Sequence, residues 1–242
     1  MNASRPALAF YATPPHRCSY LPHKEATTVF ADPQHPKDMR LYSHLSATGF
    51  RRSGEQIYVP ACEHCRACTP VRVPVLGFKP KRRQRRVFAR NADLKVIAKP
   101  DHFDETQFQL YQRYVNARHP GGGMDDPSRQ EYMEFLTSSW SDTVFYEFRL
   151  ESALLAVAVT DRLDDGLSCV YTFFEPTLNT RALGVFAILW QIWETARLGL
   201  DYCYLGYWIG ETTKMQYKAD YLPQEQFVRG KWTLIGARER RP

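Results

Sequence analysis

The longest apolar run of the chain, residues 182–193, constrains the fold more than any other segment. It is interrupted by Gln191 and falls short of the ~18 apolar residues that a membrane span needs. Since it ends ahead of Gly199, it predicts a buried helix over residues 182–196. A buried helix needs neighbours, and a composition of 44% hydrophobic residues can supply a sizeable core. We therefore expect a soluble globular protein, neither a membrane protein nor a disordered chain.

The segments around this helix have strand and helix patterns in an α/β order. Two helices are expected first, one from Asp104 to before His119 and one from an Asp126-Pro127 cap to about Ser139, with a flexible glycine loop at 119–123 between them. Strands are expected at 143–150, 153–160 and 167–174 before the buried helix, and at 202–207 after it. A short helix at 213–221 and a hairpin around Gly230 close the chain. The sequence thus predicts an α/β or α+β fold for this half.

The first hundred residues differ from the rest in composition. They are rich in Pro, His and Arg, lack helical periodicity, and contain short apolar stretches at 27–31, 57–60, 71–75 and 94–98. Strands and loops are expected there. We place a domain boundary near Lys99-Pro100, which separates a strand-rich, cysteine-containing domain at 1–99 from a C-terminal domain at 100–242.

The charge of the chain is unevenly distributed. Residues 1–120 carry 20 basic and 9 acidic side chains, a net charge of +11, whereas residues 121–242 carry 12 and 17, a net charge of −5. Six cations fall within the eight residues from Lys79 to Arg86. This pattern favours nucleic acid as a partner, because neutralising phosphates releases counterions. The alternatives are a solvated basic face or a protein-docking segment.

The N-terminus provides no sign of export. It lacks a lysine-led stretch followed by an apolar block, so no signal peptide is expected. A cytoplasmic location follows as the expectation, and it bears on the chemistry of the cysteines because cytoplasmic thiols are kept reduced.

Three of the six cysteines form the run Cys62-Glu-His-Cys65-Arg-Ala-Cys68. In a cytoplasmic protein this spacing indicates metal or redox chemistry more often than a disulfide. A zinc or iron-sulfur site needs a fourth ligand, for which Cys18 is the first candidate and His64, His16 and His23 are alternatives. Reduced or redox-responsive thiols are the competing interpretation. Cys169 and Cys203 lie in apolar strand patterns and are expected in the core.

The element order from residue 104 resembles the N-acetyltransferase (GNAT) superfold. The resemblance implies that an acyl donor lies where the strands before and after the long helix splay apart. Members that use coenzyme A carry an Arg/Gln-x-x-Gly-x-Gly/Ala pattern at the start of this helix, whose amides hold the pyrophosphate. Here the segment is Arg181-Ala-Leu-Gly184-Val-Phe186. We expect Phe186 to obstruct a pyrophosphate, which argues against coenzyme A.

Five segments together are specific for one family. They are Cys18-Ser-Tyr-Leu, the cysteine run with its flanks from Tyr58 to Arg72, Tyr171-Thr-Phe-Phe-Glu-Pro176, Leu205-Gly-Tyr-Trp-Ile209 and Lys214-Met-Gln-Tyr-Lys218. From about residue 10 to 235 the chain resembles bacterial aspartate/glutamate leucyltransferases, which are related to eukaryotic arginyl-tRNA-protein transferases. The resemblance implies transfer of leucine from leucyl-tRNA to an N-terminal Asp or Glu, which marks the acceptor protein for degradation (the N-end rule).

The reaction implied by the resemblance needs no cofactor and no ATP, because the acceptor amine attacks an ester that is already activated. It needs donors to the oxyanion, a proton for the leaving ribose hydroxyl, and an acceptor for the amine proton. Tyr171 and Tyr217 are candidates for the first two tasks and Glu175 for the third. A core tyrosine or a surface ion pair is the alternative for each.

Binding of the two substrates is assigned to further residues. Lys218 or Arg118 would bind the acceptor carboxylate, with Lys214 in the same family-like segment. Phe173, Phe174 and Trp208 would shape a leucine pocket or stack on the terminal adenine, unless they are core residues. The tRNA phosphates would contact Lys79, Lys81, Arg82, Arg83, Arg85, Arg86 and Arg90.

Two other functions compete with this interpretation. A metal-containing RNA-binding module would explain the cysteines and the positive charge of residues 1–120, but it would leave the C-terminal half without a function. A CoA-dependent N-acyltransferase would explain the second half, but Phe186 and the basic run argue against it.

Overall fold

An eight-stranded sheet runs through the structure, a computed structural model that describes residues 7–118 and 126–236. The expected glycine loop at 119–123 lies outside the described residues. The strand order is β14-β13-β7-β12-β11-β10-β9-β8, and the bounds are β7 Thr69–Pro74, β8 Lys95–Pro100, β9 Thr143–Leu150, β10 Ala153–Arg162, β11 Gly166–Phe174, β12 Tyr202–Trp208, β13 Gln224–Val228 and β14 Lys231–Ile235. Its only parallel pair among the described strands is β11 with β12.

A smaller sheet is formed by the first sixty residues. Its order is β1-β4-β6-β5, with β1 at Phe10–Ala12, β4 at Thr28–Ala31, β5 at Arg51–Ser53 and β6 at Gln56–Pro60. A two-stranded ribbon, β2 (His16–Arg17) with β3 (Glu25–Ala26), precedes β4. Helix α1 (Met39–Ala47) packs with this sheet through Tyr42 and Leu45, in a core cluster that also contains Tyr204 of β12. The small sheet is thus joined to the large one through a shared core.

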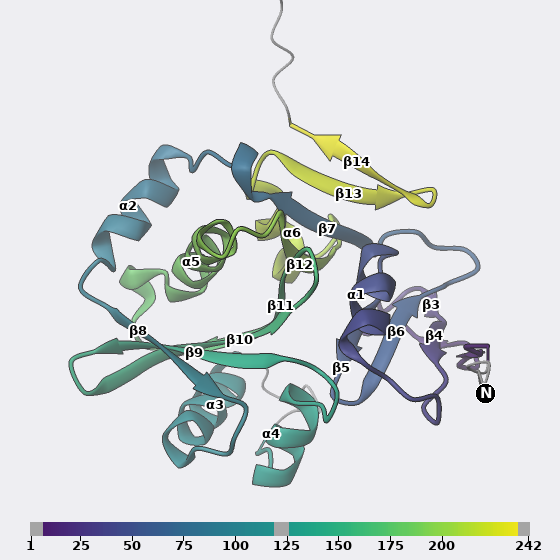
Figure 1. Cartoon of the computed structure of the whole chain (residues 1–242), viewed down its shortest axis with the longest axis horizontal. Coiled ribbons are helices and arrows are strands. Elements are labelled where there is room, and N and C mark those ends of the chain that lie inside the picture. Colours follow the sequence, from purple (N-terminus) through teal and green to yellow (C-terminus); the bar gives the residue numbers. More distant parts are fainter. Residues whose placement is uncertain (1–6, 119–125, 237–242) are drawn as a thin grey trace, which may run out of the picture.

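Helices cover both faces of the large sheet (Figure 1). Helices α3 (Glu105–Arg118) and α4 (Arg129–Leu136) lie on one face, around a core that includes Phe145 and Phe173. Helices α2 (Arg82–Arg90) and α5 (Leu183–Arg197) lie on the other, around Phe148 and Phe186. The helix expected over 182–196 is confirmed as α5. Most of its apolar side chains are buried.

Strands β11 and β12 diverge after a short parallel contact. Their register covers only three pairs, which end at Ser168↔Tyr204, although β11 continues to Phe174 and β12 to Trp208. Helix α5 connects these two strands. The splayed strand pair on either side of a long helix confirms the GNAT-like α/β arrangement expected for this half.

The first hundred residues are more helical than expected. Helices α1 and α2 both lie in a region for which only strands and loops were predicted, and that prediction was wrong for them. The proposed boundary near residue 99 does not separate two sheets, because β7 and β8 are strands of the eight-stranded sheet and β7 pairs with β12 and β13. No helix in the described ranges has the length and apolarity required to cross a membrane.

Helix ends account for the remaining differences. Helix α4 begins after Ser128, whose hydroxyl accepts from the amide of Glu131 while the Glu131 carboxylate accepts from the Ser128 amide. This reciprocal capping box replaces the predicted Asp126-Pro127 cap. The helix expected at 213–221 is shorter, with α6 at Thr213–Gln216 followed by the 3-10 helix η3 at Tyr217–Asp220. The hairpin around Gly230 is confirmed by the pairing of β13 with β14.

Candidate functional site

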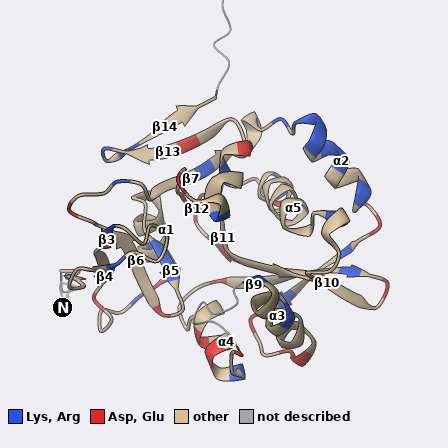
Figure 2. Cartoon of the chain, turned by 180° about the vertical axis from the view of Figure 1, so that it is seen from behind, with Lys and Arg blue, Asp and Glu red and all other residues tan. Residues whose placement is uncertain are grey.

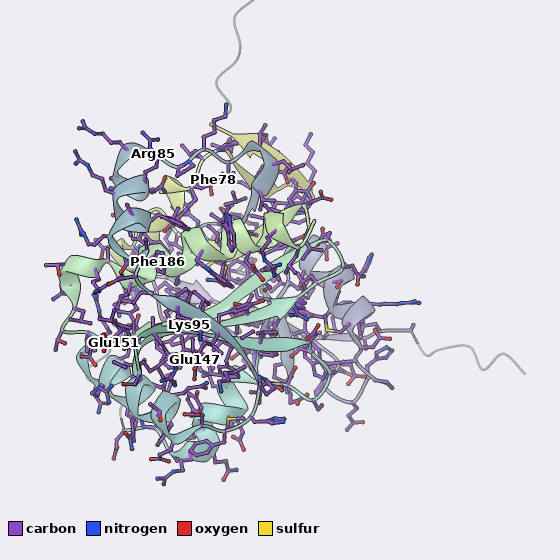
Figure 3. All side chains as sticks on the ribbon, turned by 60° about the vertical axis from the view of Figure 1, so that its left-hand side comes forward. Phe78, Arg85, Lys95, Glu147, Glu151 and Phe186 are labelled. Carbon is purple, nitrogen blue, oxygen red and sulfur yellow. The ribbon has the colours of Figure 1, made fainter. Side chains whose placement is uncertain are left out.

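Most of the basic run folds into helix α2, which is largely blue in Figure 2, and the labelled Arg85 points away from the protein in Figure 3. Gln84 is buried on the opposite side, where its Oε1 accepts from the Lys81 amide at 2.7 Å and caps the helix. Phe88 packs on Phe186 of α5 with ring centroids 5.4 Å apart. One side of α2 is therefore fixed to the protein, and the other presents Arg82, Arg83, Arg85, Arg86 and Arg90 to solvent.

The cations of this helix differ in their partners. Arg83 and Lys81 pair with Asp220, Arg85 donates to the carbonyl of Pro80, and Arg90 donates to the carbonyl of Thr180. Within residues 7–118 and 126–236, Lys79, Arg82 and Arg86 have neither an ion pair nor a side-chain hydrogen bond. These three are the cations most available to an external phosphate.

The end of β11 lies against the last turns of α3. The guanidinium of Arg118 lies 5.5 Å from the ring centroid of Phe174, and the ring of Tyr114 packs at a tilt against the same ring, with centroids 4.8 Å apart. Glu175, which follows the strand, accepts from Arg113 at 3.1 Å and from the Thr177 hydroxyl at 2.9 Å. Burial raises the pKa of Glu175, but these hydrogen bonds outweigh it and the pKa lies below its usual range. Glu175 is therefore an ionised acceptor at neutral pH, and a weak base.

Two of the predicted site residues hold buried polar atoms without partners. The Tyr171 hydroxyl and the Trp208 indole nitrogen are both enclosed, and no group in the described part of the chain hydrogen-bonds to them. Burial, with the charges of Tyr114 and Tyr111, raises the pKa of Tyr171, so its hydroxyl stays a neutral donor. An unpaired buried donor is costly in a native protein, so a substrate oxygen would be a favourable partner.

Helix η3 carries Tyr217 and Lys218 toward the same splay. Tyr217 is 42% exposed, and the Lys218 amine lies 5.9 Å from its ring centroid. Lys218 is only 7% exposed and donates to the carbonyl of Tyr207 at 2.7 Å. Burial and the charge of Arg51 lower the pKa of Lys218 to about 7. Lys214, in contrast, is exposed to solvent on α6.

Two phenylalanines occupy places other than those predicted. Phe173 is fully buried and packs edge-on against Tyr111 and Tyr132, so it is a core residue that substrate does not reach. Phe186 is also buried, where it packs against Phe88 and Phe148 instead of lying open at the start of α5. At that helix start the ring of Phe174 lies 3.0 Å from where a Cβ on Gly184 would be. Phe174, not Phe186, is the aromatic residue that fills this space.

The four predicted metal ligands come from two segments and lie near one another. Burial, together with the charges of Cys18, Cys62 and Cys65, raises the pKa of Cys68 to about 11. The Leu21 amide donates to the Cys18 sulfur at 3.4 Å. Among the described residues, however, no three His, Cys, Asp or Glu side chains are arranged closely enough to hold a metal ion. The donors therefore suit a soft metal, while their arrangement would have to tighten around it.

Arg66 holds the cysteine loop together, and two of the candidate histidines make other contacts. The Arg66 guanidinium donates to the carbonyls of Cys62, Glu63 and Cys65. His64 is 85% exposed beside Glu63, and His16 bonds to the carbonyl of Pro14. A cavity of about 530 Å³ adjoins the loop, between Cys62, Cys68 and Phe227.

One residue at the splay was not foreseen. Arg51 of β5 reaches Ser168 and Cys169 at the point where β11 leaves β12. The only local signal is Gly206, because an isolated glycine within a strand often marks a close approach of another group. The contact itself joins residues more than one hundred positions apart, which no local pattern can show.

Comparison with known families decides the membership of the chain. The family model described as "Arginine-tRNA-protein transferase, C terminus" matches residues 106–228, and the one described as "Arginine-tRNA-protein transferase, N terminus" matches residues 16–86. The chain belongs to this family. Its resemblance to transferases that use aminoacyl-tRNA is therefore confirmed, and the chain is an aminoacyltransferase.

Curated relatives within the family match nearly the whole chain. An aspartate/glutamate leucyltransferase of Pseudomonas paraeruginosa is 53% identical over 228 residues, which cover 94% of this chain and 97% of that protein. Those of Pseudomonas fluorescens and Pseudomonas putida are 54% and 51% identical with the same coverage. Among solved structures, L-PGS from Bacillus licheniformis aligns at a TM-score of 0.45 and 8% identity, over 59% of this chain and 47% of that one. That similarity is too low to carry an argument.

Proposed function

We propose that this transferase moves leucine from leucyl-tRNA to the N-terminal Asp or Glu of acceptor proteins, and so marks them for degradation. The observation that carries the proposal is the match of 51–54% identity, along nearly the entire chain, to aspartate/glutamate leucyltransferases. The splay between β11 and β12 and the solvent-facing basic side of α2 support it. A location in the cytoplasm, where aminoacyl-tRNA is available, stays a prediction.

The chemistry is an aminolysis. The acceptor α-amine attacks the carbonyl carbon of the leucyl ester and a peptide bond forms. The ester bond to the ribose breaks, and the proton that the amine loses is balanced by the proton that the ribose oxygen gains. The amine has an ordinary pKa of about 7.7 to 8.0, so a large part of it is already neutral near physiological pH. Holding amine and ester in attack geometry can lower the barrier by about 7 to 11 kcal/mol. Positioning therefore has more effect than acid-base strength.

The side chains at the splay can be assigned to these steps. Glu175, ionised and held by Arg113 and Thr177, would accept a hydrogen bond from the attacking amine. The unpaired hydroxyl of Tyr171 would donate to the oxyanion, and the hydroxyl of Tyr217 would protonate the leaving ribose oxygen. Phe174 would bound the leucyl side chain, with Trp208 at the end of the neighbouring strand.

Substrate charge would be met by two groups of cations. Lys218 and Arg118 would attract the acceptor carboxylate, with Lys214 at the outer edge. The exposed cations from Lys79 to Arg90 would follow the tRNA backbone. The tRNA and a protein N-terminus would thus approach different surfaces of the same domain.

Transfer with defined substrates tests the proposal. Purified protein is mixed with a peptide that begins with Asp, Glu or Lys and with labelled leucyl-tRNA, labelled arginyl-tRNA or labelled acetyl-CoA. We expect label from leucyl-tRNA in the Asp and Glu peptides alone. Label from acetyl-CoA would indicate an N-acyltransferase, and tRNA binding without any transfer would indicate an RNA-binding module.

We also propose that Cys18, Cys62, Cys65 and Cys68 bind zinc or an iron-sulfur cluster that stabilises the N-terminal part, since the transfer step itself needs no metal. The mutual electrostatic influence of the four thiols supports this. Metal analysis of anaerobically purified protein, beside Cys62→Ser and Cys65→Ser, tests it, with Cys203→Ser as the control. Fully active protein free of zinc and iron would contradict the proposal.

A further inference from the structure

The divergence of β11 and β12 leaves backbone carbonyls that no neighbouring strand can pair. Pairing ends at Ser168↔Tyr204, and beyond this point cations take the place of the missing strand. Arg51 donates to the carbonyl of Cys169 on β11, and Lys218 donates to the carbonyl of Tyr207 on β12 at 2.7 Å. Each side of the splay is thus lined by the donor group of a basic side chain.

The backbone of β12 is shaped to admit Arg51. Gly206 has a φ of +81°, and a Cβ at this position would lie 3.2 Å from the Arg51 guanidinium carbon. The register of β12 with β7 shifts between Tyr204 and Gly206, which marks an irregularity at the same place. Any larger residue at position 206 would displace the guanidinium, so a glycine at this position leaves room for the Arg51 side chain.

These two cations lack a counter-charge. Arg51 bonds to the Ser168 hydroxyl at 2.9 Å and to one carbonyl, and Lys218 bonds to a carbonyl. In the part of the chain that the structure describes, neither forms an ion pair. The adjacent Arg52 shows the contrast, because it binds Asp161 through two contacts of 2.6 Å. Asp161 is therefore already neutralised by Arg52, and within the described residues no carboxylate pairs with Arg51 or Lys218.

We propose that Arg51 determines acceptor specificity by binding the side-chain carboxylate of the N-terminal Asp or Glu, with Lys218 as the second cation of the same anion site. This inference rests on the proposed function and deepens it. A guanidinium presents a planar pair of donors that matches a carboxylate. The present partners of Arg51 are neutral, so its positive charge is not balanced by an anion.

The depth of the site favours a carboxylate over a tRNA phosphate. Lys218 is almost fully buried and Arg51 is partly buried, so the anion must enter the splay. The first side chain of a peptide would enter there, and its α-amine would then lie beside the residues at the end of β11. The exposed cations of α2 suit the tRNA backbone better, because phosphates can reach them from solvent.

The test compares acceptors that differ only in charge. The ratio of kcat/KM for an Asp-starting peptide to that for an Asn-starting peptide is measured with leucyl-tRNA for the unmodified protein, Arg51→Gln and Arg51→Lys. Arg129→Gln, an exposed arginine on α4, is the matched control. We expect Arg51→Gln to reduce the ratio at least about tenfold, Arg51→Lys to retain part of it, and the control to retain all of it.

The ratio separates specificity from folding, because it does not depend on how much of the variant is active. A purely structural role of Arg51 would lower both kcat/KM values equally and leave the ratio unchanged, which would overturn the inference. If Arg51→Gln has no turnover, the Kd of each peptide is measured by titration in place of kcat/KM. The inference is overturned if the ratio of the Kd values for the Asn and Asp peptides is the same in Arg51→Gln as in the unmodified protein. Absence of transfer by the unmodified protein would instead defeat the proposed function.

Discussion

Adjacent arginines on one strand illustrate how context sets the role of a residue. Arg52 is buried with Asp161, and both side chains are fully inaccessible. Arg51, one position earlier, is part-buried and has only neutral partners. Removing one member of a buried ion pair leaves the other charge unpaired, whereas removing a cation without a counter-charge does not. The two positions should therefore separate stability from function.

Urea unfolding of Arg52→Gln and Arg51→Gln tests this difference. We expect Arg52→Gln to lower the free energy of unfolding by about 3 to 5 kcal/mol, because Asp161 remains buried without a cation. Arg51→Gln should lower it by clearly less. Equal losses for the two variants would contradict the distinction.

The buried amine of Lys218 should make stability depend on pH. Its pKa in the folded protein, about 7, lies below the ordinary 10.5, mainly through burial and next through Arg51, with Cys169 acting in the opposite sense. The unfolded chain therefore binds the proton more tightly, and the stability of the protein should rise with pH between about 7 and 10.5. Below pH 7 the full cost of burying the charge applies.

Replacing this amine tests whether the buried charge of Lys218 destabilises the protein at low pH. At pH 6 we expect Lys218→Met to increase the free energy of unfolding by on the order of 2 kcal/mol, and we expect the advantage to vanish toward pH 10. Thermal or urea unfolding across this range measures it, with the exposed Lys214→Met as the control. A variant less stable than the unmodified protein at pH 6 would show that the amine is stabilising there.

At the scale of elements, helix α2 combines two tasks on its two sides. Gln84 and Phe88 fix it to the protein, and the cations face outward. Arg82 and Arg86 are among the cations without an internal partner in the described residues, so they should contribute most to tRNA binding.

The salt dependence of tRNA binding tests this assignment. We expect Arg82→Gln with Arg86→Gln to weaken binding and to reduce the slope of log Kd against log salt by about 1.5, roughly 0.7 to 0.9 for each lost phosphate contact. Arg129→Gln, on the opposite face of the large sheet, is the control. An unchanged slope would remove α2 from the tRNA interface.

The elements also show how far sequence patterns reach. The strands β9 to β12 and the helices α3 and α5 were predictable, because alternation and apolar length are local signals. Helix α2 was not, because six cations in eight residues obscured the side that packs on the protein, which carries the polar Gln84 beside Val87 and Phe88. The assignment of the end of β11 to the candidate site stays a prediction. Arg51 was missed because its contacts depend on the divergence of distant strands, and Phe173 was misplaced because both faces of β11 are apolar.

At the scale of the whole molecule, the two halves form one sheet. Strand β7 lies between β12 and β13, and Arg51 crosses from the small sheet into the splay. The C-terminal half alone would have an unpaired β12 edge and would lack one cation of the anion site. We expect a fragment of residues 100–242 to be insoluble or inactive, and co-expression with residues 1–99 to restore transfer. A soluble, fully active fragment would contradict this dependence.

The mass of an acceptor peptide tests the central claim most directly. An Asp-starting peptide is incubated with the protein and leucyl-tRNA, without ATP, free leucine or coenzyme A, and is then analysed by mass spectrometry with fragmentation. The account predicts a gain of one leucyl residue, located at the N-terminus by the fragment series. A peptide of unchanged mass, or leucine attached to a side chain, would contradict it.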